Sequence, residues 1–141
     1  MDGEHGIVEG RATPLGAYPH YRVAPPFVFV SGTSARRPDD SIAGADVGED
    51  GAVQLDIRQQ TRSVLANVSE ILDAIGLGLE DVVDVTTFLV DMDDFGGYNE
   101  VYGEILGDAG PARTTVAVRQ LPHPHLLIEV KVVARLRDSG T

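Results

Sequence analysis

Arg113 and Glu129 have the residue types and positions that acid–base chemistry on a small anion would require. Each stands in a stretch with the period-two alternation of a strand, at 113–118 and at 126–134. A guanidinium binds a carboxylate through a two-pronged set of hydrogen bonds. A glutamate between apolar neighbours loses hydration, which raises its pKa toward the range that suits proton transfer. Because the even-numbered residues of both stretches have the pattern of a core face, we expect Arg113 and Glu129 to project together from the opposite face.

The same residues allow a purely structural interpretation. Glu129 would then form a salt bridge with Lys131, Arg113 or Arg119, and the spacing alone leaves this alternative open. Between the two strands, His123-Pro124-His125 has the composition of a metal-binding pair, but no third ligand follows at a familiar spacing. We therefore expect no metal and interpret these histidines as loop residues, or as substrate contacts or proton carriers at the rim of a site.

Composition narrows the classes of partner. The chain has 141 residues, which predicts a single domain over 1–141, and it has no cysteine and hence no thiol nucleophile. The net charge of −11 argues against nucleic acid or an anionic membrane as the main partner. No signal peptide, transmembrane run or phosphate-binding glycine motif is visible, so a cytoplasmic protein is expected. A site for an anion must be locally positive, and Arg36-Arg37 is the one adjacent basic pair.

Hydrophobic periodicity predicts the elements that position these residues. Strands are expected at 6–13, 27–30, 82–90, 113–118 and 126–134, and helices at 54–74 and 95–106. The second helix should turn Tyr98, Val101, Tyr102, Ile105 and Leu106 inward. The order predicts an α+β fold, a mixed sheet with both helices packed on one face. The stretch 27–30 is apolar on both faces, so we expect the helix-free face to be covered by another subunit. The acidic stretch 39–51 is expected to be an exposed loop, and Arg58 and Arg62 to be solvated.

Several stretches resemble the signature of the reactive intermediate deaminase (Rid) family, and the resemblance extends from about Gly16 to Ala134. It is carried, in order, by FVSG at 29–32, DF at 94–95, YNEVY at 98–102, GPARTTV at 110–116, LP at 121–122 and IEV at 128–130. The resemblance implies a chorismate-mutase-like fold, a homotrimer with sites at the subunit clefts, and hydrolysis of enamines or imines without a cofactor. It implies that Arg113 clamps a substrate carboxylate, helped by the backbone at Gly32 and Thr115. Glu129 would hold the water and move protons, and Tyr18, Ser31 and Asn99 would line the site.

Two longer stretches, DFGGYNEVYGE and RTTVAVRQLPHPHLLIE, are most similar to the 2-aminomuconate deaminases within that family. This closer resemblance implies hydrolytic deamination of 2-aminomuconate in aromatic-ring catabolism. That substrate is a dicarboxylate, and Arg36, Arg37 or a protonated His125 would bind its second carboxylate. Two alternatives stay open. One is a generalist deaminase of enamines derived from amino acids, and the other is a non-catalytic trimeric ligand-binding module.

Overall fold

The computed structural model describes residues 4–107 and 110–138. The strands are β1 (His5–Gly6), β2 (Tyr21–Ala24), β3 (Phe27–Ser34), β4 (Ala45–Val47), β5 (Val53–Leu55), β6 (Val82–Leu89), β7 (Ala112–Ala117) and β8 (Ile128–Arg135). The helices are α1 (Ile57–Asp73) and α2 (Phe95–Leu106), with short 3-10 turns η1 (Leu79–Asp81) and η2 (Met92–Asp94). None of the helices in the described ranges is both long and apolar enough to cross a membrane.

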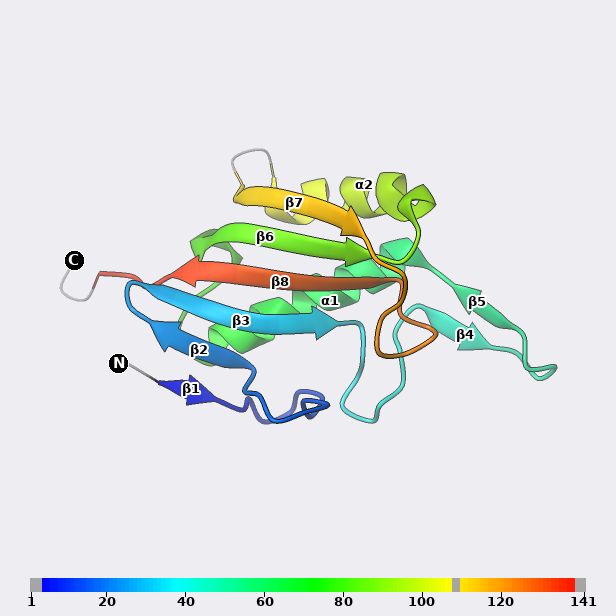
Figure 1. Ribbon diagram of the computed structural model, residues 1–141, viewed down its shortest axis with the longest axis horizontal. Coiled ribbons are helices and arrows are strands. Elements are labelled where there is room, and N and C mark those ends of the chain that lie inside the picture. The colour runs from blue at the N-terminus through cyan, green and yellow to red at the C-terminus, as the bar shows by residue number, and fades with distance from the viewer. Residues whose placement is uncertain (1–3, 108–109, 139–141) are drawn as a thin grey trace.

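Six strands form one sheet in the order β1-β2-β3-β8-β6-β7. Every pairing is antiparallel except the parallel pair β6 and β7, so the sheet is mixed. Both α-helices lie on one face of this sheet, and the β4–β5 ribbon projects from its end (Figure 1). The predicted fold class, a mixed sheet with two helices on one face, is confirmed.

α1 supplies much of the core. The α1 side chains that face β3 and β8 are buried, and they follow the predicted helical stripe: Val64, Leu65, Val68 and Leu72. The helix begins at Ile57 rather than 54, because the Asp56 side chain accepts a hydrogen bond from the Gln59 N–H and caps the first turn. The residues before the cap belong to β5 instead. The α1 carboxyl end is followed by Gly76 at φ +77°, a conformation that glycine adopts without strain.

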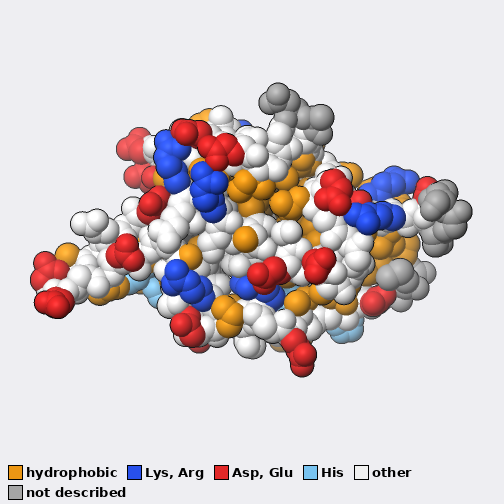
Figure 2. Space-filling view, turned by 180° about the vertical axis from the view of Figure 1, so that it is seen from behind, with side chains coloured by type: hydrophobic (Ala, Val, Ile, Leu, Met, Phe, Trp, Pro, Cys, Tyr) orange, Lys and Arg blue, Asp and Glu red, His pale blue; other side chains and the backbone are white. Residues whose placement is uncertain are grey.

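α2 has the predicted bounds, and Tyr98, Val101 and Tyr102 are buried as expected. Ile105 is 36% exposed, so its predicted inward orientation was wrong. Arg58 and Arg62 are exposed as expected, and they also pair with Glu100 and Glu104, which joins α1 to α2. Figure 2 shows basic and acidic side chains side by side on this helix-bearing face. Both pairs are about half exposed, and such pairs contribute little to stability.

Two irregular segments differ from the sequence predictions. The predicted edge strand at 6–13 is reduced to β1, because the following residues turn away to form a loop over the sheet edge. The stretch 39–51 is not wholly an exposed loop, since it contains β4 and buries Ile42 and Ala43 in the core.

The helix-free face of the sheet is apolar but uncovered within a single chain. Val28 and Val30 are fully buried beneath the helices, whereas Phe29 is 40% and Val116 39% exposed on the other face. The expectation that 27–30 is covered on both sides therefore holds for one side only within a single chain. Cover by another subunit stays a prediction.

Candidate functional site

A cavity of about 380 Å³ opens beside Glu129, where segment 11–20 passes over the end of β3. Such a volume suits a small molecule. Among the residues expected to form a site, those that line it are Tyr18, Ser31, Gly32, Arg36 and Glu129. These side chains come from parts of the chain more than a hundred residues apart, and the β3–β8 pairing brings them together.

Glu129 is half-buried, and no cation among the described residues pairs with it. Its pairing with Ser34 on β3 and Phe88 on β6 places it in the centre of the sheet, and burial raises its pKa. Within the described residues it forms no ion pair, so the proposed structural salt bridge is not observed. The Lys131 ammonium instead lies 5.9 Å from the centre of the Phe29 ring. A carboxyl group in this environment is suited to take up and release a proton.

Gly32 gives the Glu129 carboxylate its room. The β3–β8 register shifts between Val30 and Thr33, and Gly32 stands in this irregularity. A Cβ at Gly32 would lie 2.6 Å from Glu129 Oε2. Any larger residue at position 32 must therefore displace the carboxylate.

Gly32→Ala is expected to reduce turnover at least tenfold while leaving the fold intact, because the displaced group is the end of a flexible side chain. Steady-state kinetics and thermal unfolding of the variant check this. Gly103→Ala is the matched control, since nothing lies within 4 Å of a Cβ at that position. Full activity in Gly32→Ala would show that the carboxylate position is not critical.

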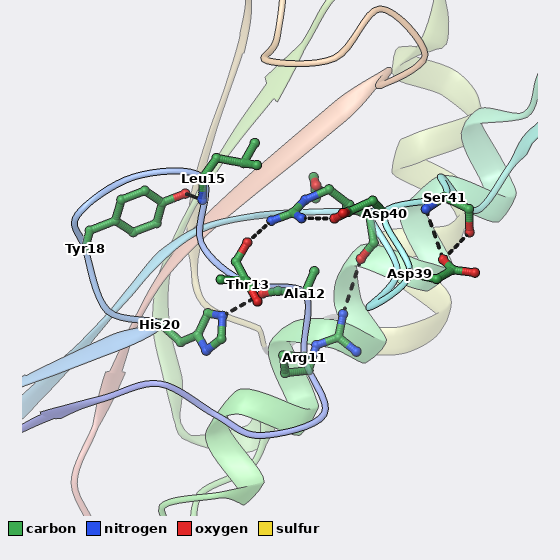
Figure 3. A network of polar contacts seen from close by, with 11 residues as sticks. Arg11, Ala12, Thr13, Leu15, Tyr18, His20, Asp39, Asp40 and Ser41 are labelled. Atoms are coloured by element: carbon green, nitrogen blue, oxygen red, sulfur yellow. Dashed lines mark hydrogen bonds and ion pairs between the residues drawn. The ribbon is translucent and has the colours of Figure 1, made fainter.

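His20 fixes the segment that roofs the cavity. Its Nδ1 accepts a hydrogen bond from the Val8 N–H at 2.8 Å, and its Nε2 lies 2.9 Å from the Ala12 carbonyl oxygen. Because a carbonyl only accepts, Nε2 carries the proton and the ring is neutral. Figure 3 shows the contact between His20 and Ala12 and also the Tyr18 hydroxyl, which accepts a hydrogen bond from the Leu15 N–H. The roof is therefore held by side-chain contacts rather than by regular structure.

Ser31 lies in the cavity wall and is held there by two hydrogen bonds. Its hydroxyl donates to the Pro19 carbonyl at 2.8 Å, and its N–H donates to the His20 carbonyl at 3.0 Å. Both bonds join β3 to the roofing segment. Ser31 thus shapes the cavity through its position, with its hydroxyl hydrogen already engaged.

The predicted common face of Arg113 and Glu129 was wrong. β7 pairs in parallel with β6 so that Arg113 lies opposite Val85, a fully buried residue on the helix side. The guanidinium carbon lies 4.7, 5.2 and 5.7 Å from the ring centres of Tyr102, Tyr98 and Phe95, all on α2. These aromatic faces attract the cation to the helix side. Arg113 and Glu129 therefore lie on opposite faces of the sheet.

Thr115 follows Arg113 to the helix side. Its Oγ1 lies 3.3 Å from the Tyr98 hydroxyl, which is also 2.7 Å from Thr87 Oγ1. The Tyr102 hydroxyl is buried and has no hydrogen-bond partner among the described residues. Burial is the main cause that raises the pKa of Tyr102, and the nearby Tyr98 raises it further. The Tyr102 hydroxyl therefore stays protonated and can donate to a bound acceptor. Arg113 and these hydroxyls form a second cluster, separate from the Glu129 cavity.

The remaining predicted contacts lie outside the cavity. Asn99 is exposed on α2, because the buried positions of that helix are its neighbours. Arg37 points away and donates to the Ser41 hydroxyl at 3.2 Å. Of the loop histidines, His123 lines the cavity and His125 does not. The His125 N–H donates to His123 Nδ1 at 3.0 Å. In the described ranges no three His, Asp or Glu residues gather as metal ligands would.

The sequence analysis overlooked Gln60, which holds the His-Pro-His loop on α1. Its amide is fully buried, donates to the His125 carbonyl at 2.8 Å and accepts from the Leu127 N–H at 2.9 Å. Asn67, also on α1, similarly donates to the Ser34 carbonyl and lines the cavity. Both stand next to apolar positions of the helical stripe, and a polar residue there is the signal that could have revealed them.

Gln60→Leu is expected to lower the free energy of unfolding by about 3 kcal/mol, because two buried backbone groups lose their partner. Urea unfolding measures the change. Gln59→Leu on the exposed side of the same helix is the control and should change stability little. Equal stabilities of the two variants would refute the role of the Gln60 amide.

Comparison with known proteins agrees with this architecture. Residues 9–136 match the family model described as Endoribonuclease L-PSP. A RutC family protein of Pyrococcus horikoshii is 40% identical over 128 residues, which are 91% of this chain and 94% of that protein. The structure of YyfA from Yersinia pestis, described as a member of the conserved Rid protein family, superposes with a TM-score of 0.78 at 26% identity, over 94% of this chain and all of YyfA.

TdcF of E. coli, whose structure was solved with bound serine, also has a TM-score of 0.78, at 26% identity and over 95% of this chain and 99% of TdcF. The family match covers most of the chain, and the similarity in sequence and in fold extends over nearly its whole length. The chain therefore belongs to the Endoribonuclease L-PSP family, to which the Rid proteins belong.

Proposed function

We propose that this protein is a cofactor-independent cytoplasmic deaminase that hydrolyses a carboxylate-bearing enamine or imine, with 2-aminomuconate as its substrate. The observation that carries the proposal is Glu129, a half-buried carboxyl group with a raised pKa and no ion pair among the described residues, in the wall of a small-molecule cavity. The closer sequence resemblance to 2-aminomuconate deaminases supports the choice of substrate.

The chemistry needs one proton carrier and one activated water. Protonation of the enamine at carbon gives an electrophilic imine, and water attacks the imine carbon. The tetrahedral adduct then expels ammonia and leaves the carbonyl product. Glu129 holds the water and transfers the protons, and Arg113 binds the substrate carboxylate and orients the reacting carbon.

A complete site requires a second copy of the chain in this proposal. Arg113 and Glu129 lie on opposite faces of one sheet, so the same substrate cannot reach both in a single chain. The apolar helix-free face, which includes Phe29 and Val116, supports association with other copies. We therefore propose a homotrimer in which Arg113 of one copy completes the Glu129 cavity of its neighbour. Light scattering should give the trimer mass, and a monomer mass would refute the shared site.

The substrate is tested by ammonia release from freshly generated 2-aminomuconate, measured beside a small enamine derived from an amino acid. Faster turnover of 2-aminomuconate is expected. Equal or better turnover of the small enamine would favour the second candidate, a generalist deaminase. The serine bound to TdcF is the observation that favours this candidate. No release from either substrate would favour a ligand-binding module.

The family description names RNA cleavage, so RNA belongs in the same assay. The net charge of −11 gives this chain little attraction for a phosphate backbone. We expect RNA to remain intact under conditions in which ammonia is released.

A further inference from the structure

Two arginines, Arg11 and Arg36, line the same cavity as Glu129. Their side chains are only 9% and 13% exposed. The chain has 11 basic residues against 22 acidic ones, so two nearly buried arginines in one cavity are a marked local departure from its overall charge. Removing a cation from water is costly, and it is tolerated where an anion compensates for the lost hydration.

The anions now beside these arginines lie toward solvent. Arg11 donates to Glu70 Oε2 at 3.0 Å and to the Arg36 carbonyl at 3.4 Å. Arg36 donates to Asp40 and to the Thr13 carbonyl. Figure 3 shows Arg11 and Thr13, which belong to the roofing segment, near Asp40. The side chains of Glu70 and Asp40 are 59% and 74% exposed, so water weakens their hold on the two cations.

Donor capacity is left over on both guanidinium groups. Each guanidinium has five N–H donors, and the contacts above use two on each. The wall of the cavity therefore combines two cations with one carboxyl group, Glu129, whose raised pKa favours its neutral form. The end of the cavity formed by Arg11 and Arg36 is locally positive.

We infer that Arg11 and Arg36 bind a second carboxylate of the substrate and make the site selective for dicarboxylates. This inference rests on the proposed function, in which Arg113 of a neighbouring copy binds the first carboxylate. Of the residues expected from the sequence to bind the second one, Arg37 and His125 lie outside the cavity and Arg36 lies within it, joined by the unforeseen Arg11.

A pair of stable ligands tests the inference without turnover. Muconate and sorbate share a six-carbon diene chain, and a methyl group in sorbate replaces the second carboxylate of muconate. Titration calorimetry on the wild-type chain should show muconate binding at least about tenfold more tightly than sorbate, as charge-assisted hydrogen bonds predict. Equal affinities would overturn the inference.

The variants Arg11→Gln and Arg36→Gln should each weaken muconate binding about tenfold or more and leave sorbate binding unchanged. Arg37→Gln is the matched control, because its side chain is exposed next to Arg36 and contacts Ser41 outside the cavity. Retained preference for muconate in both arginine variants would overturn the inference. So would an equal loss in Arg37→Gln, which would indicate a general charge effect.

Asp40→Asn covers the case in which an arginine variant does not fold. Asp40 is exposed at φ +70°, a conformation that asparagine tolerates, so this variant should fold. It frees Arg36 from a competing carboxylate, and muconate should bind several-fold more tightly while sorbate does not. Unchanged or weaker muconate binding contradicts the role of Arg36.

These outcomes are separable from failure of the proposed function. A chain that binds muconate selectively but releases no ammonia keeps the dicarboxylate subsite and loses the deaminase proposal. A chain that releases ammonia from enamines but binds sorbate and muconate equally keeps the deaminase proposal and loses the subsite.

Discussion

Glu129→Gln is expected to lower kcat about a thousandfold, the effect of removing a positioned general acid–base group. Glutamine keeps the size and the hydrogen-bonding reach of the side chain but cannot take up a proton. Burial raises the pKa of Glu129, which makes the native carboxylate a stronger base than an exposed one, whereas the amide cannot take up a proton at all. Glu49→Gln in an exposed loop is the control, and steady-state ammonia release is the measurement. Full activity in Glu129→Gln would remove this residue from the mechanism.

The same substitution should leave the fold intact and more stable at neutral pH. With a folded-state pKa above the usual 4.5, the folded chain holds the Glu129 proton more tightly than the unfolded chain. Its contribution to stability is full below pH 4.5 and is lost as the pH rises through the folded-state pKa. Chemical unfolding at several pH values should therefore show that the Glu129→Gln variant is more stable than wild type at neutral pH, with the difference disappearing in acid. A destabilised variant at neutral pH would mean that the ionised carboxylate has a favourable partner.

Replacing Arg113 by lysine is expected to raise KM about tenfold to a hundredfold, with a smaller change in kcat. Lysine keeps the positive charge but loses the planar fork that binds both oxygens of a carboxylate. Arg119→Lys, at an exposed position beyond the same strand, is the control. An unchanged KM in Arg113→Lys would show that the substrate carboxylate is bound elsewhere.

Stability data separate this binding role from packing. The Arg113 guanidinium contacts the rings of Phe95, Tyr98 and Tyr102, and cation–π contacts of this kind contribute about 1–2 kcal/mol. Arg113→Ala loses that contribution, whereas lysine retains part of it. A raised KM in the lysine variant together with nearly native thermal stability would therefore point to lost recognition rather than lost packing.

The fold class was predictable from the sequence because its signals are local. The helical stripe of α1 and the strict alternation of β8 each predict which side chains are buried. The residues buried as predicted include Leu126, Ile128, Val130, Val132 and Ala134. The bounds of α2 were also correct. A sheet with helices on one face follows from these patterns.

The face of Arg113 could not be read in the same way. β7 is an edge strand with alanine and threonine on both sides, so its alternation does not identify a core face. Its orientation is set by the parallel register with β6 and by the tyrosines of α2, both of which are tertiary features. Pattern reasoning on a single strand has no access to either.

The residues that line the cavity were only partly predictable from the sequence. Family resemblance pointed to Tyr18, Ser31 and Gly32, whereas Arg11 and His20 lie in irregular or strand-edge positions without periodicity. Their placement depends on side-chain hydrogen bonds to other segments of the chain, such as the one that His20 accepts from the Val8 N–H. The cavity is thus assembled by contacts that no local pattern encodes.

The shared site is tested most directly by mixing two inactive variants. Copies carrying Glu129→Gln and copies carrying Arg113→Ala, co-expressed with different tags and purified as mixed trimers, should regain activity. A mixed trimer holds two copies of one variant and one of the other, so about one cleft in three has both native side chains, one from each neighbour. Mixed trimers of Glu129→Gln and Glu129→Ala contain no such cleft and serve as the control. About a third of the wild-type kcat/KM is the predicted result for purified mixed trimers. Mixed trimers as inactive as their parents would contradict a site built from Arg113 and Glu129 of neighbouring copies.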